Sequence, residues 1–284
     1  MDAGARSPPR TRDAWEVLRV RQWLVFSPLP AAGIARLDEV RGARAGEIAG
    51  AVVASSLALA YAYGINAIFD RGTDLDGHKN VLAGRQSVPL PAIASVAGAG
   101  LLAILAGALL GAGALVSIAA SLAAGTVYSA GPRLKRFPAV GLTANLLIFA
   151  PLLFTAVRPG SPSPALWLLV TVFALLVTQN QLLHEEGDAA EDEAAGAMTT
   201  GRWLGPRGVR GAVVALAAAI AACGVASRAP FSGGVCAVGA VATAWIGLWD
   251  HPARQRRQAH RYLAATIGAA LFLALTGAPW GAAS

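Results

Sequence analysis

Two groups of polar side chains repeat with the same four-residue spacing. The first acidic motif is Asn66, Asp70 and Asp74 in NAIFDRGTD, and the second acidic motif is His184, Asp188 and Asp192 in HEEGDAAED. Because residues at i, i+4 and i+8 lie on one face of a helix, we expect each motif to present two carboxylates in one direction. Carboxylates that face one another in an apolar protein need a partner, and a divalent cation such as Mg²⁺ is the simplest one.

The composition indicates a membrane protein. The chain has 284 residues, of which 55% are hydrophobic and only 14% are charged, whereas about a quarter of the residues in soluble domains are charged. Apolar stretches of membrane-spanning length recur along the whole sequence. We therefore predict an all-α, polytopic membrane bundle that forms a single domain over residues 1–284, with residues 1–14 as a flexible cytoplasmic tail.

Nine segments are candidates for transmembrane helices. They are residues 15–35, 47–69, 90–110, 113–129, 139–157, 164–184, 208–227, 233–250 and 260–278. The two acidic motifs lie at the ends of the second and the sixth of these spans. The shared spacing, four spans apart, suggests a duplicated helical unit.

The distribution of basic residues predicts the orientation. All but five of the 23 Lys and Arg residues lie in the N-terminal segment or in the loops after the even-numbered spans. By the positive-inside rule, the N-terminus and these loops are cytoplasmic, both acidic motifs face the cytoplasm, and the C-terminus is outside. The net charge of +7 is therefore explained by insertion into the cell (inner) membrane, and no nucleic-acid partner is expected.

Polar residues inside the apolar spans favour a functional site over a solvated helix end. Asn66 lies within the second span, where an unpaired amide is unfavourable. His184 fits either a core histidine or a residue that orients a ligand. Asn180 belongs to a polar run, QNQ, in the sixth span; it could form interhelical hydrogen bonds or line a pocket for a second substrate.

Basic residues are expected at the same membrane face as the acids. Arg133 and Lys135 follow the fourth span in YSAGPRLKRFP, and Lys79 follows the first motif. As anchors under the positive-inside rule they need no further role. Next to carboxylates and Mg²⁺, however, they would neutralise a diphosphate.

These segments resemble the UbiA superfamily of intramembrane prenyltransferases. NAIFDRGTD is similar to its NDxxDxxxD motif, and HEEGDAAEDEAAGAMTTGRWLG is similar to its second DxxxD region. YSAGPRLKR and the N-terminal LRVRQW resemble two further family segments, and the resemblance covers nearly the whole chain in order. The chain departs from the family pattern at Ala67, where the family usually has Asp, and in lacking the basic residues that often follow each motif.

The resemblance implies Mg²⁺-dependent transfer of an isoprenoid chain from a prenyl diphosphate to a small, aromatic or lipid-like acceptor. The implied metal ligands are Asp70, Asp74, Asp188 and Asp192, and Asn66 would fix their geometry. The implied diphosphate ligands are Lys79, Arg133, Lys135, Arg19 and Tyr128. Asn180 and His184 would contact the acceptor. Tyr61, Tyr128 and Phe149 are candidates for stabilising an allylic cation.

Three other activities remain open. A terpene cyclase of the same superfamily would ionise the same diphosphate and quench the cation internally. A related enzyme would transfer a phosphoribosyl group to a polyprenyl phosphate, as the LRVRQW start suggests. An ion-coupled transporter would use the buried acids as a cation site.

Overall fold

The computed structural model describes residues 11–32, 45–74, 77–156 and 164–275, and the regular elements in these ranges are all helices. Six of them are long and apolar enough to cross a membrane. They are α4 (Ala45–Phe69), α5 (Leu90–Leu110), α6 (Ala112–Ser129), α8 (Pro164–Gly187), α10 (Thr200–Ala226) and α11 (Pro230–Leu248). Their length and apolar character follow directly from the apolar stretches of the sequence.

Two further predicted spans coincide with helices of a different kind. The span predicted at 139–157 forms α7 (Val140–Phe149), which continues as the 3₁₀-helix η4 (Ala150–Phe154). Pro151 lies at this junction, where it cannot donate the backbone hydrogen bond of a continuing α-helix. The last helix, α12 (Ala253–Leu275), begins with a strongly basic turn. Because neither α7 nor α12 is among the six long apolar helices, the count of nine spans remains a prediction.

The prediction of one continuous span at 15–35 is wrong for the residues described. The chain forms short helices instead: α1 (Thr11–Glu16), α2 (Val20–Trp23), η1 (Leu24–Phe26) and α3 (Leu29–Ala32). Arg19 separates the first two with a left-handed backbone at φ 51°, and Pro28 precedes the last. Helix α1 begins at Thr11, within the segment predicted as a flexible tail. Residues 1–10 and 33–35 lie outside the described residues.

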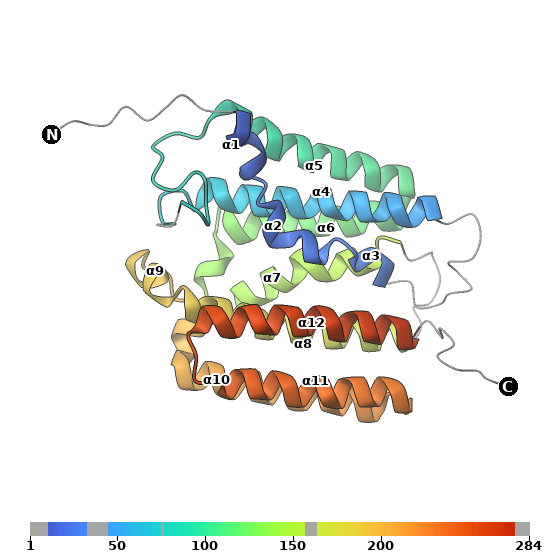
Figure 1. Ribbon diagram of the computed structural model, residues 1–284. Coiled ribbons are helices and arrows are strands. Elements are labelled where there is room, and N and C mark those ends of the chain that lie inside the picture. The colour runs from blue at the N-terminus through green and yellow to red at the C-terminus, as the bar shows by residue number, and fades with distance from the viewer. Residues whose placement is uncertain (1–10, 33–44, 75–76, 157–163, 276–284) are drawn as a thin grey trace.

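The long helices form two groups with a common direction (Figure 1). In the first group α4 packs against α5 and α6, and in the second α10 packs against α8 and α11, while α12 packs against α8 and α11. Helix α7 lies between the groups and contacts both α6 and α8. The short helices α2 and α3 contact α4. The two groups each start with the helix that carries an acidic motif, which is consistent with a duplicated unit.

Glycine allows the closest helix contacts within each group. A Cβ atom at Gly125 in α6 would lie 2.9 Å from Cβ of Ala62 in α4. A Cβ atom at Gly224 in α10 would lie 2.7 Å from Cβ of Cys236 in α11. Small residues let helix backbones approach closely in lipid, where the apolar surroundings provide little drive for association.

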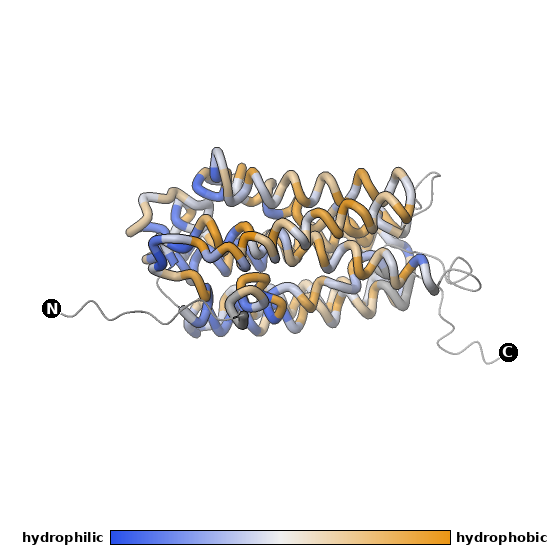
Figure 2. Tube along the Cα trace, turned by 90° about the horizontal axis from the view of Figure 1, so that it is seen from above, coloured by the Kyte–Doolittle hydropathy of each residue, from blue (hydrophilic) through white to orange (hydrophobic). Residues whose placement is uncertain are grey.

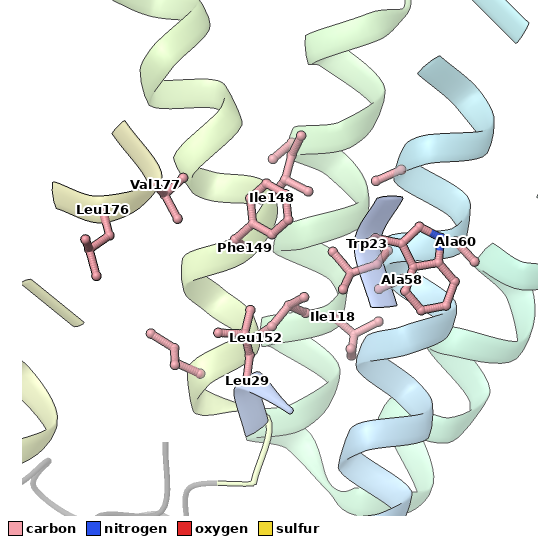
Figure 3. Close-up of a cluster of buried hydrophobic side chains, with 14 of the residues drawn as sticks. Trp23, Leu29, Ala58, Ala60, Ile118, Ile148, Phe149, Leu152, Leu176 and Val177 are labelled. Carbon is pink, nitrogen blue, oxygen red and sulfur yellow. The ribbon is translucent and has the colours of Figure 1, made fainter. Parts of the chain in front are cut away.

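The core joins the two groups and the short N-terminal helices. Figure 3 shows Trp23 and Leu29 from the N-terminal segment packed with Ile118 of α6 and with Ile148 and Phe149 of α7. All five side chains are buried. The N-terminal segment is therefore part of the bundle, and it brings Arg19 to a fixed place beside the long helices.

Hydrophilic residues gather at one end of the bundle, where α9 lies (Figures 1 and 2). This polar end contains four connections between helices. They are residues 70–89 (of which 75 and 76 are not described), 130–139, 188–199, which includes α9 (Ala189–Ala194), and 249–252. Contacts between distant loops hold it together: the Arg136 guanidinium donates to the Ala195 carbonyl at 3.1 Å, and the Ala139 amide donates to Thr200 Oγ1 at 2.9 Å.

Candidate active site

A cavity of about 750 Å³ opens at the polar end of the bundle. All twelve residues that the sequence analysis connects with the metal, the diphosphate or the acceptor line it. They are Arg19, Asn66, Asp70, Asp74, Lys79, Tyr128, Arg133, Lys135, Asn180, His184, Asp188 and Asp192. They come from four separate parts of the chain. The fold brings these four parts together around one cavity.

The first acidic motif spans the end of α4. The helix ends at Phe69, but its hydrogen-bond pattern continues beyond it. The Asp70 amide donates to the Asn66 carbonyl at 2.9 Å, and the Asp74 amide donates to the Asp70 carbonyl at 2.8 Å. Because these bonds link residues four apart, the three side chains keep one direction although the regular helix has ended.

The second motif repeats this local structure at the end of α8. The Asp188 amide donates to the His184 carbonyl at 3.0 Å, and the Asp192 amide donates to the Asp188 carbonyl at 2.9 Å. Asp188 itself, with φ −100° and ψ 8°, separates α8 from α9. Each regular helix therefore ends inside its motif, while backbone hydrogen bonds preserve the four-residue spacing beyond the helix end.

Asp70 is buried and faces two cations from the loop after α6. Arg133 donates to its Oδ1 at 2.9 Å, and Lys135 forms a close ion pair with its Oδ2. Lys135 also donates to Asn66 Oδ1 at 3.1 Å, and Ser129 donates to the same oxygen at 3.2 Å. Burial lowers the pKa of Lys135, although the Asp70 carboxylate opposes this effect.

Asp74 is held by the N-terminal segment and by its own loop. Arg19 donates to Asp74 Oδ2 at 2.8 Å, and Asn80 donates to the same oxygen at 2.9 Å. Asn80 also donates to the carbonyl of Ala67 at 2.9 Å, which ties the loop back to α4. Both arginines bound to this motif, Arg19 and Arg133, have left-handed backbones at φ 51° and 50°. Such strain in residues other than glycine is concentrated at functional sites.

Lys79 bridges the two motifs. Its Nζ lies 2.6 Å from Asp188, 3.1 Å from Glu191 and 3.8 Å from Asp74. Burial alone would lower the pKa of Lys79, but Asp188 and the other two carboxylates raise it above its ordinary value. The lysine is therefore charged, and it holds the two halves of the site together.

Of the four aspartates in the two motifs, Asp192 has the fewest neighbouring groups that stabilise its negative charge. It accepts a hydrogen bond from Thr199 Oγ1 at 3.3 Å, and within the described part of the chain it forms no ion pair. Burial, and then the charge of Asp188, raise its pKa to about 6.

His184 lies between Asp188 and an arginine of α12. Its Nδ1 is 3.3 Å from Asp188 Oδ2 and 2.8 Å from Arg257 Nη1. A guanidinium group can only donate, so Nδ1 accepts from Arg257 and carries no proton. His184 thus orients Arg257 in the cavity wall. The neighbouring Asn180 has a buried Oδ1 without a hydrogen-bond partner.

Tyr128 belongs to a series of hydrogen-bonded polar groups that connects α6, α8 and α10. Gln181 donates to the Tyr128 hydroxyl at 3.1 Å and to Glu185 Oε1 at 3.1 Å, and the Gly201 amide donates to Glu185 Oε2 at 2.7 Å. Glu185 faces the start of α10 and is only 5% exposed, so it does not belong to a solvated helix face.

Several charged residues of the cavity were not predicted as part of a site. In total, nine Lys and Arg and six Asp and Glu side chains line it. The unpredicted cations are Arg21, Arg136, Arg254, Arg257 and Arg261. From the sequence alone, Arg21, Arg254, Arg257 and Arg261 indicated only positive-inside anchors. The spacing of Arg254, Arg257 and Arg261, three and four residues apart before an apolar stretch, is the signal that could have identified one helical face.

The deeper wall of the cavity is apolar. Val25, Phe26, Ile148, Phe149 and Val177 line it. The rings of Phe26 and Phe149 pack with centroids 4.7 Å apart, and Tyr63 packs edge-on against Phe149 at 6.5 Å. Tyr61, a candidate from the sequence, points elsewhere, since its hydroxyl bonds to Thr126 at 2.8 Å.

The oxygen donors of the two motifs fit a hard cation that shares its ligands with a phosphate group. Among the described residues, no three His, Cys, Asp or Glu side chains converge on a single point where they could enclose an ion. Mg²⁺, however, is commonly held by one or two carboxylates together with waters and substrate phosphates. Two pairs of carboxylates that line one cavity match that requirement.

The chain belongs to the UbiA prenyltransferase family, whose model matches residues 29–276. This membership and the six long apolar helices identify a multi-pass membrane protein with the fold of intramembrane prenyltransferases. No curated protein matches the chain with significance.

Solved structures share the fold at low sequence identity. A UbiA homologue from Archaeoglobus fulgidus, bound to GPP and Mg²⁺, is similar with a TM-score of 0.73 and 18% identity, over 93% of this chain and 99% of that one. A UbiA homologue from Aeropyrum pernix K1 has a TM-score of 0.68 and 20% identity, over 89% and 98%. A digeranylgeranylglyceryl phosphate synthase has a TM-score of 0.67 and 13% identity, over 93% and 96%.

Proposed function

We propose that this protein is a Mg²⁺-dependent prenyltransferase that moves an isoprenoid chain from a prenyl diphosphate to a small aromatic or lipid-like acceptor. The observation that carries the proposal is one cavity in which two aspartate pairs and four of their cationic neighbours lie beside an apolar wall. A prenyl diphosphate matches both parts of the cavity, because its diphosphate binds metal and cations and its isoprenoid chain is apolar. The presence of GPP and Mg²⁺ in the related A. fulgidus structure supports the choice of donor.

The polar end would bind the diphosphate. Arg19, Lys79, Arg133 and Lys135 now neutralise aspartates. Mg²⁺ bound by Asp70, Asp74, Asp188 and Asp192 would stabilise the leaving diphosphate as a Lewis acid. The four cations would then be released from the carboxylates to contact phosphate oxygens. Asn66, held by Ser129 and Lys135, would keep the first motif in position.

The apolar wall would bind the isoprenoid chain and exclude water. When the C–O bond of the donor breaks, the electron pair leaves with the diphosphate and an allylic cation remains. Phe26, Phe149 and Tyr128, which line the cavity, would stabilise this cation with their aromatic rings. The acceptor attacks it with an electron pair and loses a proton, and Asn180 and His184 would contact the acceptor from α8.

The membrane orientation is part of the proposal. The polar end, with both motifs, would face the cytoplasm of the cell (inner) membrane, and the C-terminus would lie outside. The single-domain organisation over residues 1–284 and the count of nine spans complete the proposed architecture.

The proposal is tested with purified full-length protein in nanodiscs. The protein is incubated with geranyl, farnesyl, geranylgeranyl and longer prenyl diphosphates, with Mg²⁺ or EDTA, and with a membrane lipid extract as a source of acceptors. We expect Mg²⁺-dependent release of pyrophosphate and a new prenylated species by mass spectrometry. No Mg²⁺-dependent consumption of any prenyl diphosphate would contradict the proposal.

Additional arms separate the alternatives. A cyclic hydrocarbon formed without any acceptor would identify a terpene cyclase. Product formed only from phosphoribosyl diphosphate and a polyprenyl phosphate would identify phosphoribosyl transfer. Cation uptake into proteoliposomes without pyrophosphate release would identify a transporter.

A further inference from the structure

Glu185 differs from the other five acids of the cavity lining. Four of them pair with a Lys or Arg nitrogen, and the fifth, Asp192, is a proposed metal ligand. Glu185 is 5% exposed and forms no ion pair within the described part of the chain. The strongest charge that acts on it is that of Asp192, another acid. Hydrogen bonds, rather than a cation, must therefore stabilise this carboxyl group.

Each oxygen of Glu185 accepts a hydrogen bond from a different helix position. The Gly201 amide donates to Oε2 at 2.7 Å, and Gln181 Nε2 donates to Oε1 at 3.1 Å. Glycine allows the first contact, because a Cβ atom at Gly201 would lie only 2.7 Å from Cβ of Glu185. Two N–H donors, one for each oxygen, match an ionised carboxylate, which can only accept.

This carboxylate determines the orientation of the Gln181 amide. A glutamine side chain has a donating NH₂ group and an accepting oxygen, and the two can exchange places by rotation. The reverse orientation would place the amide oxygen of Gln181 against an oxygen of Glu185, and two buried acceptors would then lack a donor. Because Gln181 is only 5% exposed, water cannot compensate for this loss.

The Gln181 amide in turn determines the direction of the Tyr128 hydroxyl. The same Nε2 atom donates to the hydroxyl oxygen at 3.1 Å. An amide nitrogen cannot accept, so the proton of the hydroxyl points elsewhere, and it has no acceptor among the described residues. Tyr128 lines the cavity, and Asp70 and Asp192, one from each motif, are among its electrostatic neighbours. The hydroxyl proton is therefore available to a ligand bound between the two motifs.

We propose that Glu185 is a positioning residue, which acts through Gln181 to keep the Tyr128 hydroxyl as a hydrogen-bond donor to the diphosphate. The inference rests on the proposed prenyl transfer and adds two residues, Glu185 and Gln181, to its machinery. As the C–O bond of the donor breaks, negative charge grows on the diphosphate, and a donor that is already oriented stabilises it without reorganisation.

The test is a double-mutant cycle on the affinity for a donor analogue. Full-length protein in nanodiscs is titrated with geranyl S-thiolodiphosphate and Mg²⁺ by isothermal calorimetry, as wild type, Tyr128→Phe, Glu185→Gln and the double variant. We expect each single variant to bind about tenfold more weakly, as for one lost hydrogen bond to a charged group. The double variant should also be about tenfold weaker, rather than a hundredfold, because both substitutions remove the same hydrogen bond.

The choice of variants separates positioning from folding. Glu185→Gln keeps an oxygen for the Gly201 amide but no longer fixes the Gln181 amide. Gln181→Met removes the link itself; it should behave like Glu185→Gln, alone and combined with Tyr128→Phe, and it provides the reading if Glu185→Gln does not fold.

Two variants outside the cavity lining serve as controls and should bind like the wild type. Glu193→Gln removes an acid whose side chain is 77% exposed. Arg210→Gln removes a cation that lies 3.7 Å from Asp250.

The outcomes distinguish this inference from the proposed function. If Glu185→Gln and Gln181→Met weaken binding by the same factor with and without the Tyr128 hydroxyl, Glu185 acts on the fold and the inference is wrong. It is also wrong, while the donor site stands, if Tyr128→Phe or Glu185→Gln binds like the wild type. If the wild-type protein does not bind the thiolodiphosphate with Mg²⁺, the proposed function fails and the inference fails with it.

Discussion

At the scale of single residues, the site is built from acids that are neutralised by cations. Asp70, Asp74 and Asp188 each lie within 3 Å of a Lys or Arg nitrogen. The surplus of Lys and Arg over Asp and Glu in the cavity lining favours an anionic ligand. A diphosphate that arrives with divalent cations would exchange these pairs, since the metal takes the carboxylates and the phosphate takes the cations.

The residue types of the site could be predicted from the sequence, but their pairing could not. An Asn or Asp inside or next to an apolar span stands out because it is unfavourable there unless it has a partner. The partner of each acid depends on the fold: Lys79 reaches Asp188 across 109 residues, and Arg257 reaches His184 across 73. No local pattern contains this information.

Lys79 should compete with metal for the carboxylates in the free protein. We expect Lys79→Gln to bind Mn²⁺ about tenfold more tightly in the absence of diphosphate, because the lysine charge lies within 4 Å of three carboxylates. The same variant should turn over substrate more slowly, since it loses a phosphate ligand. Electron paramagnetic resonance titration of Mn²⁺ measures the affinity, with Arg210→Gln as the control; unchanged affinity in Lys79→Gln would contradict the competition.

Asp192 should make the metal-free protein less stable as the pH rises. Its pKa in the folded protein is raised to about 6 from 3.8, so the folded state favours the protonated form. Stability is therefore fully present below pH 3.8 and is lost as the pH rises through about 6. In EDTA, we expect Asp192→Asn to melt at a higher temperature than the wild type at pH 8, by a smaller margin at pH 5, and at the same temperature only below pH 3.8. If Asp192→Asn instead has a lower melting temperature than the wild type at pH 8, other groups stabilise the Asp192 carboxylate in the metal-free protein and the prediction is wrong.

At the scale of helices, both motifs lie where a regular helix stops. Polar side chains placed just beyond α4 and α8 reach the cavity, while the apolar helix remains in the membrane. The long apolar helices could be predicted from the sequence because length and composition determine them. The broken N-terminal segment could not be predicted in the same way, because Arg19, whose left-handed backbone breaks it, contacts Asp74, which lies 55 residues away in the sequence.

The contact between α4 and α6 should be sensitive to side-chain size. Gly125→Val places atoms where a Cβ would already be 2.9 Å from Cβ of Ala62, and overpacking of this kind costs about 1–3 kcal/mol. We expect the apparent melting temperature in detergent to fall by about 3 °C or more. Gly113→Ala is the control on the same helix, since no atom lies within 4 Å of its added Cβ, and it should melt like the wild type. Equal melting temperatures for both variants would show that the two helices can move apart freely.

At the scale of the whole molecule, two helical groups meet around one cavity, and each contributes one acidic motif. The loops that carry the charged residues lie together at the polar end (Figure 2). The positive-inside rule predicts that this end faces the cytoplasm. The order of the spans follows from the sequence, but the way in which the groups enclose a cavity depends on packing across α7.

The orientation can be read from the accessibility of introduced cysteines. In a background without Cys223 and Cys236, we expect Gly77→Cys and Asp250→Cys to react with an impermeant maleimide only from the cytoplasmic side. Gly113→Cys, which lies in the first turn of α6, at the end of that helix remote from the polar end, should react only from the outside. Labelling of Gly77→Cys and Gly113→Cys from the same side would contradict the predicted topology.

The central claim is that the two aspartate pairs act together on a prenyl diphosphate. Its most direct test is Mg²⁺-dependent pyrophosphate release from the donor by wild-type protein, Asp70→Asn and Asp188→Asn, measured after EDTA treatment and readdition of Mg²⁺. We predict that each single variant remains folded, as judged by its melting profile in detergent, and loses about a thousandfold or more in rate, because electrostatic stabilisation of the leaving group depends on both motifs. Full activity in both folded variants would contradict the account.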